Sequence, residues 1–157
     1  MEKQNRTLAQ AKQALLRLLN LRPRSEHEIR EKLNKKNFPA PVIDEALQYF
    51  KALDLINDLD FAKKWTAYRL LKPFGVNRIR LELKEKGIAK NIIDDVLSLA
   101  SEEVDEEAQI KSIMDRRAPK YQGLDKEKAK QRLYNYILRR GFNPQAVYKV
   151  IKKYDSK

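Results

Sequence analysis

Few residues of this chain have the chemistry of a catalytic or metal-binding site. The 157-residue sequence has one histidine, His27, and no cysteine. The run HEIRE at residues 27–31 starts like a zinc-protease helix but lacks the second histidine that such a helix requires. Glu28 is better explained as the capping partner of Ser25 at a helix start. The sequence has no glycine-rich phosphate loop and no carboxylate in an apolar setting that would suggest a raised pKa, so we expect no catalytic residue, no metal and no cofactor.

Basic side chains are the more informative chemistry. The chain has 34 Lys and Arg against 22 Asp and Glu, a formal net charge of +12. This excess favours binding to polyanions such as nucleic acid, an acidic protein surface or a nucleoprotein assembly. The surplus concentrates on residues 30–36, 78–86 and 126–140, which we interpret as helical. Lysines there can simply keep a helix soluble, whereas arginines offer a planar fork that suits phosphate or carboxylate.

The three basic segments belong to a pattern that occurs three times. The copies span residues 25–47, 75–97 and 129–151 and align on Leu33, Leu83 and Ile137, which lie 50 and 54 residues apart. In each copy one apolar residue stands four positions before the aligned residue and another stands five positions after it. These residues are Ile29, Ile79 and Leu133, and Phe38, Ile88 and Phe142. The recurrence indicates an array of small units that are stabilised mainly by stacking on one another.

A further helical segment precedes each copy, so we predict nine helices. These first helices are expected at residues 7–21, 58–72 and 102–117. No stretch alternates apolar and polar residues with period two, which favours an all-α fold. We predict a tandem array of three three-helix repeats, elongated and curved, with repeats at residues 1–54, 55–101 and 102–157. Helix starts are expected to be capped by Ser25, Asp58, Asp125 and Asn143.

The residue that follows each middle helix predicts a sharp reversal of the chain. This position holds Asn37, Gly87 and Gly141 in the three copies. Glycine enters the left-handed backbone region without a Cβ penalty and asparagine is its usual substitute, so we predict that conformation at all three residues. The apolar residue that follows is then expected to close over the end of the helix.

Two other groups of residues leave structural and functional interpretations open. The carboxylates of residues 102–107 form either an acidic docking patch or the first turns of a helix whose dipole favours negative charge, and we favour the helix. Among the aromatics, Phe61, Trp65 and Tyr68 predict a core stripe, with Arg69 placed over Trp65. Tyr134 and Tyr136, near basic residues, are expected either to stack on bases or to be partly buried.

The third helix of each copy argues against sequence-specific DNA reading by all three units. A three-helix unit with a tight turn before its last helix is reminiscent of helix-turn-helix proteins, in which the last helix enters the major groove. The last helices of copies one and two instead carry the acidic pairs at residues 44–45 and 94–95. Such charges oppose phosphate, so we interpret the middle helices as the basic, outward-facing lines.

Three motifs resemble the RecX family over about 130 residues. The motifs are Leu55-Ile56-Asn57-Asp58-x-x-Phe61-Ala62 with Arg69, then Gly75-x-x-Arg78-Ile79-x-x-Glu82-Leu83-x-x-Lys86-Gly87-Ile88, and Arg139-Arg140-Gly141-Phe142. The chain departs from the family pattern at Asp54, Asp60 and Val76, which affects local turns and charge but not the repeat plan. RecX proteins modulate the RecA recombinase, so the resemblance implies a non-enzymatic regulator of DNA repair and recombination.

The resemblance also implies a partner. A RecX protein is expected to lodge in the groove of a RecA filament on DNA, to hinder ATP hydrolysis, strand exchange and coprotease activity, and to promote filament disassembly. An elongated basic array suits such a long anionic groove, which requires many modest contacts. We expect a cytoplasmic monomer without membrane contact. The alternative is a general DNA- or RNA-binding helical array with no dedicated protein partner.

The candidate contact residues are basic side chains on or beside the middle helices. They are Arg30, Lys35, Lys36, Arg69, Lys72, Arg78, Arg80, Lys84, Arg132, Arg139 and Arg140. Arg78 and Arg80 are the leading candidates. For Arg78 an ion pair within the chain, for instance with Asp58, is the competing interpretation.

Overall fold

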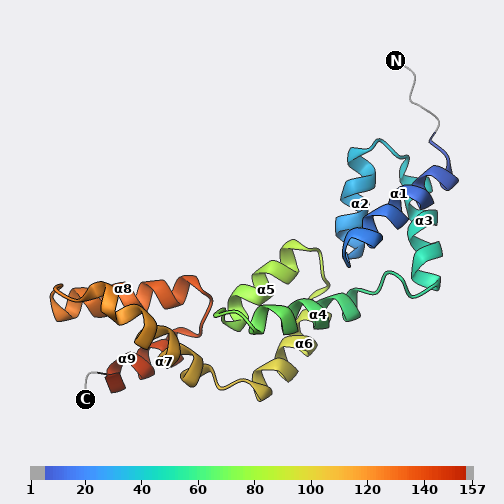
Figure 1. Ribbon diagram of the computed structural model, residues 1–157. Helices are drawn as coiled ribbons and strands as arrows, with labels where there is room; N and C mark the ends of the chain where they lie inside the picture. The colour runs from blue at the N-terminus through green and yellow to red at the C-terminus, as the bar shows by residue number, and fades with distance from the viewer. Residues whose placement is uncertain (1–5, 155–157) are drawn as a thin grey trace.

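The computed structural model describes residues 6–154, and in this part of the chain nine α-helices and one short 3-10 helix form three successive three-helix repeats. Repeat 1 contains α1 (Leu8–Leu21), α2 (Glu26–Lys35) and α3 (Ala40–Ala52). Repeat 2 contains α4 (Asp58–Leu70), α5 (Val76–Glu85) and α6 (Lys90–Glu103). Repeat 3 contains α7 (Glu106–Arg117), the 3-10 helix Ala118–Tyr121, α8 (Lys126–Arg139) and α9 (Pro144–Tyr154). The described residues contain no strand, and the repeats follow one another along an elongated, bent line (Figure 1), as predicted.

Each repeat buries a small core of its own. The cores are built around the pairs that the repeat pattern predicted, which are Ile29 and Leu33, Ile79 and Leu83, and Leu133 and Ile137. In each repeat the first and middle helices both pack on the third helix. Since the three cores are separate, the orientation of one repeat relative to the next depends on the contacts between them.

The turns after the middle helices have the predicted left-handed backbone. Asn37, Gly87 and Gly141 have φ angles of 60°, 73° and 85°. After the first two turns, the next amide returns to the helix that has just ended, because Phe38 N donates to Leu33 O at 3.2 Å and Ile88 N donates to Leu83 O at 3.1 Å. Phe38, Ile88 and Phe142 are buried over the helix ends, which confirms the prediction.

The predicted helix starts are confirmed at three of four positions. Ser25 and Glu28 form a capping box, Asp125 accepts hydrogen bonds from two amides of α8, and the Asn143 side chain accepts from Gln145 N. The prediction for Asp58 is wrong, because Asn57 caps α4 and leaves the Asp58 side chain free for another contact.

The prediction for the acidic segment is wrong in part. Glu102 and Glu103 end α6 instead of starting the next helix, which begins at Glu106 with Asp105 as its cap. The chain between them is extended at Val104, so the run of carboxylates is divided between two helix ends. The repeat boundaries at residues 54 and 101 stay predictions.

The junction between repeats 1 and 2 joins the start of α2 to the end of α5. Ser25 Oγ donates to Lys86 O at 2.6 Å, and Glu26 N donates to Asp58 Oδ1 at 2.9 Å. Lys86 Nζ lies 3.2 Å from the Glu28 carboxylate. A Cβ at Gly87 would lie 2.3 Å from the Cβ of His27, so the glycine lets the two repeats approach closely.

The junction between repeats 2 and 3 joins the equivalent parts, the start of α5 and the end of α8. Gly75 N donates to Arg140 O at 2.9 Å and Asn77 N donates to Gly141 O at 3.1 Å. A Cβ at Gly141 would lie 2.3 Å from Arg78 N. At both junctions the electropositive start of one middle helix therefore meets the electronegative end of the next middle helix.

Candidate partner interface

Repeats 1 and 2 hold an equivalent ion pair between the middle and third helices. Arg30 of α2 pairs with Asp44 of α3, and Arg80 of α5 pairs with Asp94 of α6. Arg30 also reaches Glu26 at 3.5 Å, and Lys90 lies 2.7 Å from Asp94. These are the acidic residues that the sequence marked as unsuited to phosphate. They neutralise arginines of the adjacent helix, although all of these side chains remain partly exposed.

A buried carboxylate organises the basic side chains of repeat 2. Glu82 of α5 is buried and accepts hydrogen bonds from the guanidinium groups of Arg69 and Arg78 and, at 3.1 Å, from the indole of Trp65. Arg69 also lies over the Trp65 ring at 5.9 Å, as predicted. Burial raises the pKa of the Glu82 carboxyl, but the hydrogen bonds from Arg69 and Arg78 outweigh it, so the pKa lies below its ordinary value.

The competing interpretation of Arg78 is correct in kind and wrong in its partner. Arg78 Nε donates to Glu82 at 3.0 Å, whereas the carboxylate of Asp58 accepts from the backbone of Glu26. The aromatic stripe also differs from the prediction, since Tyr68 is exposed while Phe61 is buried and Trp65 is partly buried. Lys72 lies 5.8 Å from the ring of Tyr68.

Repeat 3 has tyrosines at the positions of the two carboxylates, Glu82 and Asp94, that pair with arginines in repeat 2. Tyr134 and Tyr148 stand where repeat 2 has Arg80 and Asp94. Tyr136 stands where repeat 2 has Glu82, one residue before the buried residue on which the copies align. Tyr134 and Tyr136 are partly buried, which is one of the two alternatives that the sequence left open. Repeat 3 therefore lacks the internal anions that balance the arginines of repeat 2.

Five candidate residues are exposed and form neither an ion pair nor a contact with an aromatic ring within residues 6–154. They are Lys35, Lys36, Lys84, Arg132 and Arg139. In contrast, Arg30, Arg69, Arg78 and Arg80 all have carboxylate partners. The sequence correctly placed basic residues on the middle helices, but it could not distinguish the paired ones from the others.

Arg140 belongs to a group of cations that the sequence prediction largely missed. Its guanidinium donates to Pro73 O at 3.2 Å. A pocket of about 240 Å³ beside it is lined by Pro73, Ile113, Arg116, Arg117, Lys120, Tyr136 and Arg140. The available signal was the segment of residues 116–124, which carries three basic residues and no acidic one. It lies outside the middle helices, where most of the surplus charge is found.

Family models of the three RecX three-helix domains match this chain in order. The first domain matches residues 11–50, the second matches residues 57–97 and the third matches residues 105–151. The chain belongs to the RecX family. Each RecX domain match lies within one of the three helical repeats of the structure.

Curated relatives of this RecX chain cover most of its length. A protein named Regulatory protein RecX from Haemophilus influenzae (strain PittEE) is 36% identical over 129 residues, which cover 82% of this chain and 84% of that protein. One of the same name from Streptomyces coelicolor is 30% identical over 145 residues, covering 92% and 77%. The crystal structure of RecX from Lactobacillus salivarius superimposes with a TM-score of 0.80 at 23% identity, covering 96% and 97% of the two chains. That likeness supports the fold.

Residues 6–154 offer neither a membrane span nor a metal-ligand cluster. None of their helices has the length and apolar character needed to cross a bilayer. They also contain no cluster of three histidine, aspartate or glutamate side chains that could hold a metal ion. His27 packs against Gly87 at the first junction and lies 3.8 Å from Glu31.

Proposed function

We propose that this RecX chain binds the RecA nucleoprotein filament and inhibits its recombinase, ATPase and coprotease activities, and so modulates DNA repair and recombination. The observation that carries the proposal is the match of all three repeats to RecX domains, in order, in a chain whose relatives are named regulatory proteins. It acts in the cytoplasm as a monomer, by binding and without catalysis.

The two junctions support this mode of action. They link three small cores into one array through contacts between consecutive middle helices. A repeating filament offers the same surface at regular intervals, so an array of repeats can make several modest contacts with it at once. The net charge of +12 favours an anionic groove and predicts binding that weakens with salt.

The exposed basic residues without ion pairs are the first contact candidates. A cation that already has a carboxylate partner has less to gain from a second anion and must exchange one for the other. We therefore place Lys35, Lys36, Lys84, Arg132 and Arg139 ahead of Arg78 and Arg80. Direct contact with DNA belongs to the same proposal, since the filament groove contains it.

The test is ATP hydrolysis by the cognate RecA on single-stranded DNA during titration with this chain. Inhibition at or below equimolar amounts is expected. The variant Lys35→Glu with Lys84→Glu reverses two unpaired charges of the middle helices, and contacts of roughly 0.5–1 kcal/mol each predict about tenfold weaker inhibition. Arg17→Glu with Lys63→Glu is the matched control, because it makes the same charge change on α1 and α4 and leaves inhibition nearly unchanged.

An absence of inhibition together with tight binding to bare DNA would contradict the proposal and favour a general nucleic-acid-binding array. If the variant and its control lose inhibition equally, RecA remains the proposed partner, but the middle helices are not the surface that contacts it. Circular dichroism of both variants checks that the helices are intact.

A further inference from the structure

The pocket between repeats 2 and 3 is lined by four cations and no carboxylate. Arg116 and Arg117 come from the end of α7, Lys120 from the 3-10 helix and Arg140 from the residue after α8. None of the four forms an ion pair within the described residues. Arg116 and Lys120 are exposed, whereas Arg117 and Arg140 are partly buried, so the repulsion between these like charges is screened least between Arg117 and Arg140 and an anion there would relieve it.

One aromatic ring holds two of these cations close together. The guanidinium carbon of Arg117 lies 4.3 Å from the centroid of the Tyr136 ring, and that of Arg140 lies 4.8 Å from it. Arg140 is also fixed by its hydrogen bond to Pro73 O. Contact with one ring and the backbone orders the two forks before any ligand arrives, which lowers the entropy cost of binding.

The equivalent site in repeat 2 contains a carboxylate that balances the arginine charge. Arg117 and Arg69 are equivalent, since each lies twelve residues after the cap of its helix, Asp105 and Asn57. In repeat 2 the arginine donates to the buried carboxylate of Glu82, whereas in repeat 3 the equivalent position is Tyr136. Arg117 Nε and Arg69 Nε are both buried without a hydrogen-bond partner, so the two sites differ in the carboxylate and not in this atom. Repeat 3 therefore retains the cationic side of the site without its anion.

We propose that this pocket binds a phosphate group from outside the chain. A single carboxylate is balanced by two arginines in repeat 2, and four cations call for an anion with more charge and more acceptor oxygens, as a phosphate has. Because Tyr136 already lies against two guanidinium groups, its ring is not free to stack on a base. The site therefore takes the phosphate of a nucleic-acid backbone or of a nucleotide without regard to base. This inference does not depend on the proposed recombinase partner.

The sharpest variant restores the missing carboxylate without removing any arginine. Tyr136→Glu places a carboxylate where repeat 2 has Glu82, so it should pair with Arg117 and occupy the site. Its matched control is Tyr134→Glu, which makes the same charge change on the same helix outside the pocket.

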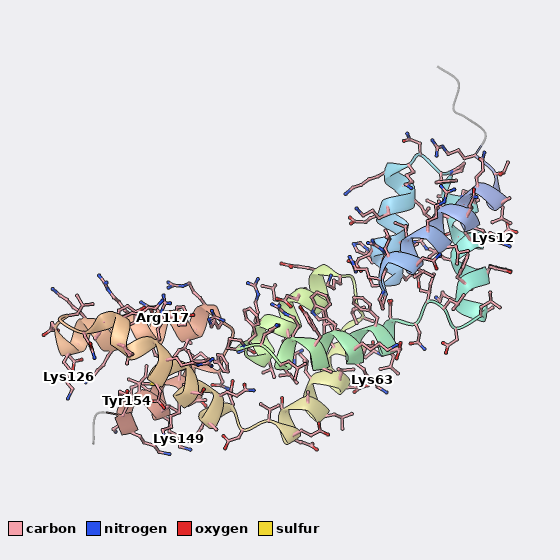
Figure 2. All side chains as sticks on the ribbon, in the orientation of Figure 1. Lys12, Lys63, Arg117, Lys126, Lys149 and Tyr154 are labelled. Carbon is pink, nitrogen blue, oxygen red and sulfur yellow. The ribbon has the colours of Figure 1, made fainter. Side chains whose placement is uncertain are left out.

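A second variant, Arg116→Gln with Arg117→Gln, removes two of the cations. Its control is Arg17→Gln with Lys63→Gln, which makes the same charge change in repeats 1 and 2. Figure 2 shows Lys63 well separated from Arg117. Arg17 lies on α1 in repeat 1, and neither control residue lines the pocket.

The measurements use the full chain without a protein partner. Fluorescence anisotropy with a labelled oligothymidine reports backbone phosphate, and competition with inorganic pyrophosphate reports a free phosphate. We expect Tyr136→Glu and the double glutamine variant to raise the Kd for the oligonucleotide about tenfold. The slope of log K against log salt should fall by about 0.7 for each phosphate that the variant no longer neutralises. Both controls should stay within about twofold.

The two probes distinguish the sources of the phosphate. Competition by pyrophosphate that is abolished in Tyr136→Glu supports a site for free phosphates, and a loss of oligonucleotide affinity alone supports one for the polymer backbone.

Unchanged binding in both pocket variants, with thermal melting equal to that of the parent chain, would overturn the proposal. Competition by polyglutamate as strong as that of pyrophosphate would overturn phosphate as the ligand and favour an acidic protein segment. If a variant melts at a lower temperature than the parent chain, Arg117→Lys is used in its place. This substitution keeps the charge but removes the planar guanidinium group, so affinity should still fall.

Discussion

The junction between repeats 1 and 2 and the junction between repeats 2 and 3 bring the same parts of the repeat together with different chemistry. At the first junction, side chains make the contact, with Ser25 and Glu28 on one side and Lys86 on the other. At the second, backbone amides of Gly75 and Asn77 reach backbone carbonyls directly. Both junctions need a glycine where the repeats meet, Gly87 at the first and Gly141 at the second. The first junction is in addition expected to depend on pH, because a carboxylate takes part in it.

The largest effect should come from a methyl group at the second junction. Gly141→Ala places a Cβ 2.3 Å from Arg78 N and strains a backbone with φ of 85°. We expect a loss of about 3 kcal/mol in the free energy of unfolding, of which about 1 kcal/mol is backbone strain. Urea unfolding followed by circular dichroism measures it.

A matched glycine separates the two causes. Gly123 has a similar φ of 89°, but a Cβ there meets no atom within 4 Å, so Gly123→Ala should cost only about 1 kcal/mol. Equal losses at the two glycines would mean that close approach between the repeats contributes nothing.

An intermediate effect is expected from acid at the first junction. Burial raises the pKa of Glu28, but hydrogen bonds from Arg22, Lys86 and the Ser25 amide outweigh it and lower the pKa from 4.5 to about 2. A carboxylate with a lowered pKa stabilises the fold above pH 4.5, and this contribution disappears as the pH falls from about 4.5 toward 2. Its magnitude is at most about 3 kcal/mol.

The variant Glu28→Gln should lack this contribution at neutral pH and lose less stability between pH 4.5 and 2 than the parent chain. Thermal melting across that range measures the difference. Glu107→Gln is the comparison inside repeat 3. Hydrogen bonds from Lys149 and Lys153 also lower the pKa of Glu107, but this carboxylate is more exposed than Glu28, so solvent screens its pairs and the effect of its removal should be smaller. If both variants follow the parent curve, the first junction does not sense pH through Glu28.

The smallest effect should come from one hydroxyl. Ser25 and Thr7 form the same capping box, but only the Ser25 hydroxyl also donates across the junction, to Lys86 O. We expect Ser25→Ala to cost about 2 kcal/mol and Thr7→Ala about 1 kcal/mol, the difference being one buried hydrogen bond. Losses of equal size in denaturant unfolding would assign Ser25 to capping alone.

The sequence predicted the array because its signals are local. A buried pair such as Ile79 and Leu83 repeats at helical spacing, and the left-handed turn at Gly87 requires a residue type that is visible in the sequence. The prediction for Asp58 failed because Asn57 and Asp58 are adjacent and both suit a cap. The contact that distinguishes them is to the backbone of α2, in another repeat.

The candidate interface was harder to predict because ion pairing depends on how helices cross. Arg80 and Asp94 are fourteen residues apart, and only the packing of α5 on α6 brings them together. The basic residues of α5 therefore looked equivalent although Lys84 is unpaired and Arg80 is not. The pocket around Arg117 is lined by residues of α7, the 3-10 helix, α8 with the residue after it, and the chain between α4 and α5, so no single segment of the sequence reveals it.

The turn residues also bear on whether the array can grow. Gly87 and Gly141 each lie under the start of a neighbouring middle helix, where a Cβ does not fit. The equivalent turn of repeat 1 carries Asn37, which is exposed. A second copy of the chain stacked on this turn in the same geometry would meet a side chain where the other junctions have none. We therefore expect Asn37 to oppose end-to-end stacking of copies at the outer side of repeat 1, while its backbone makes the same turn as the two glycines.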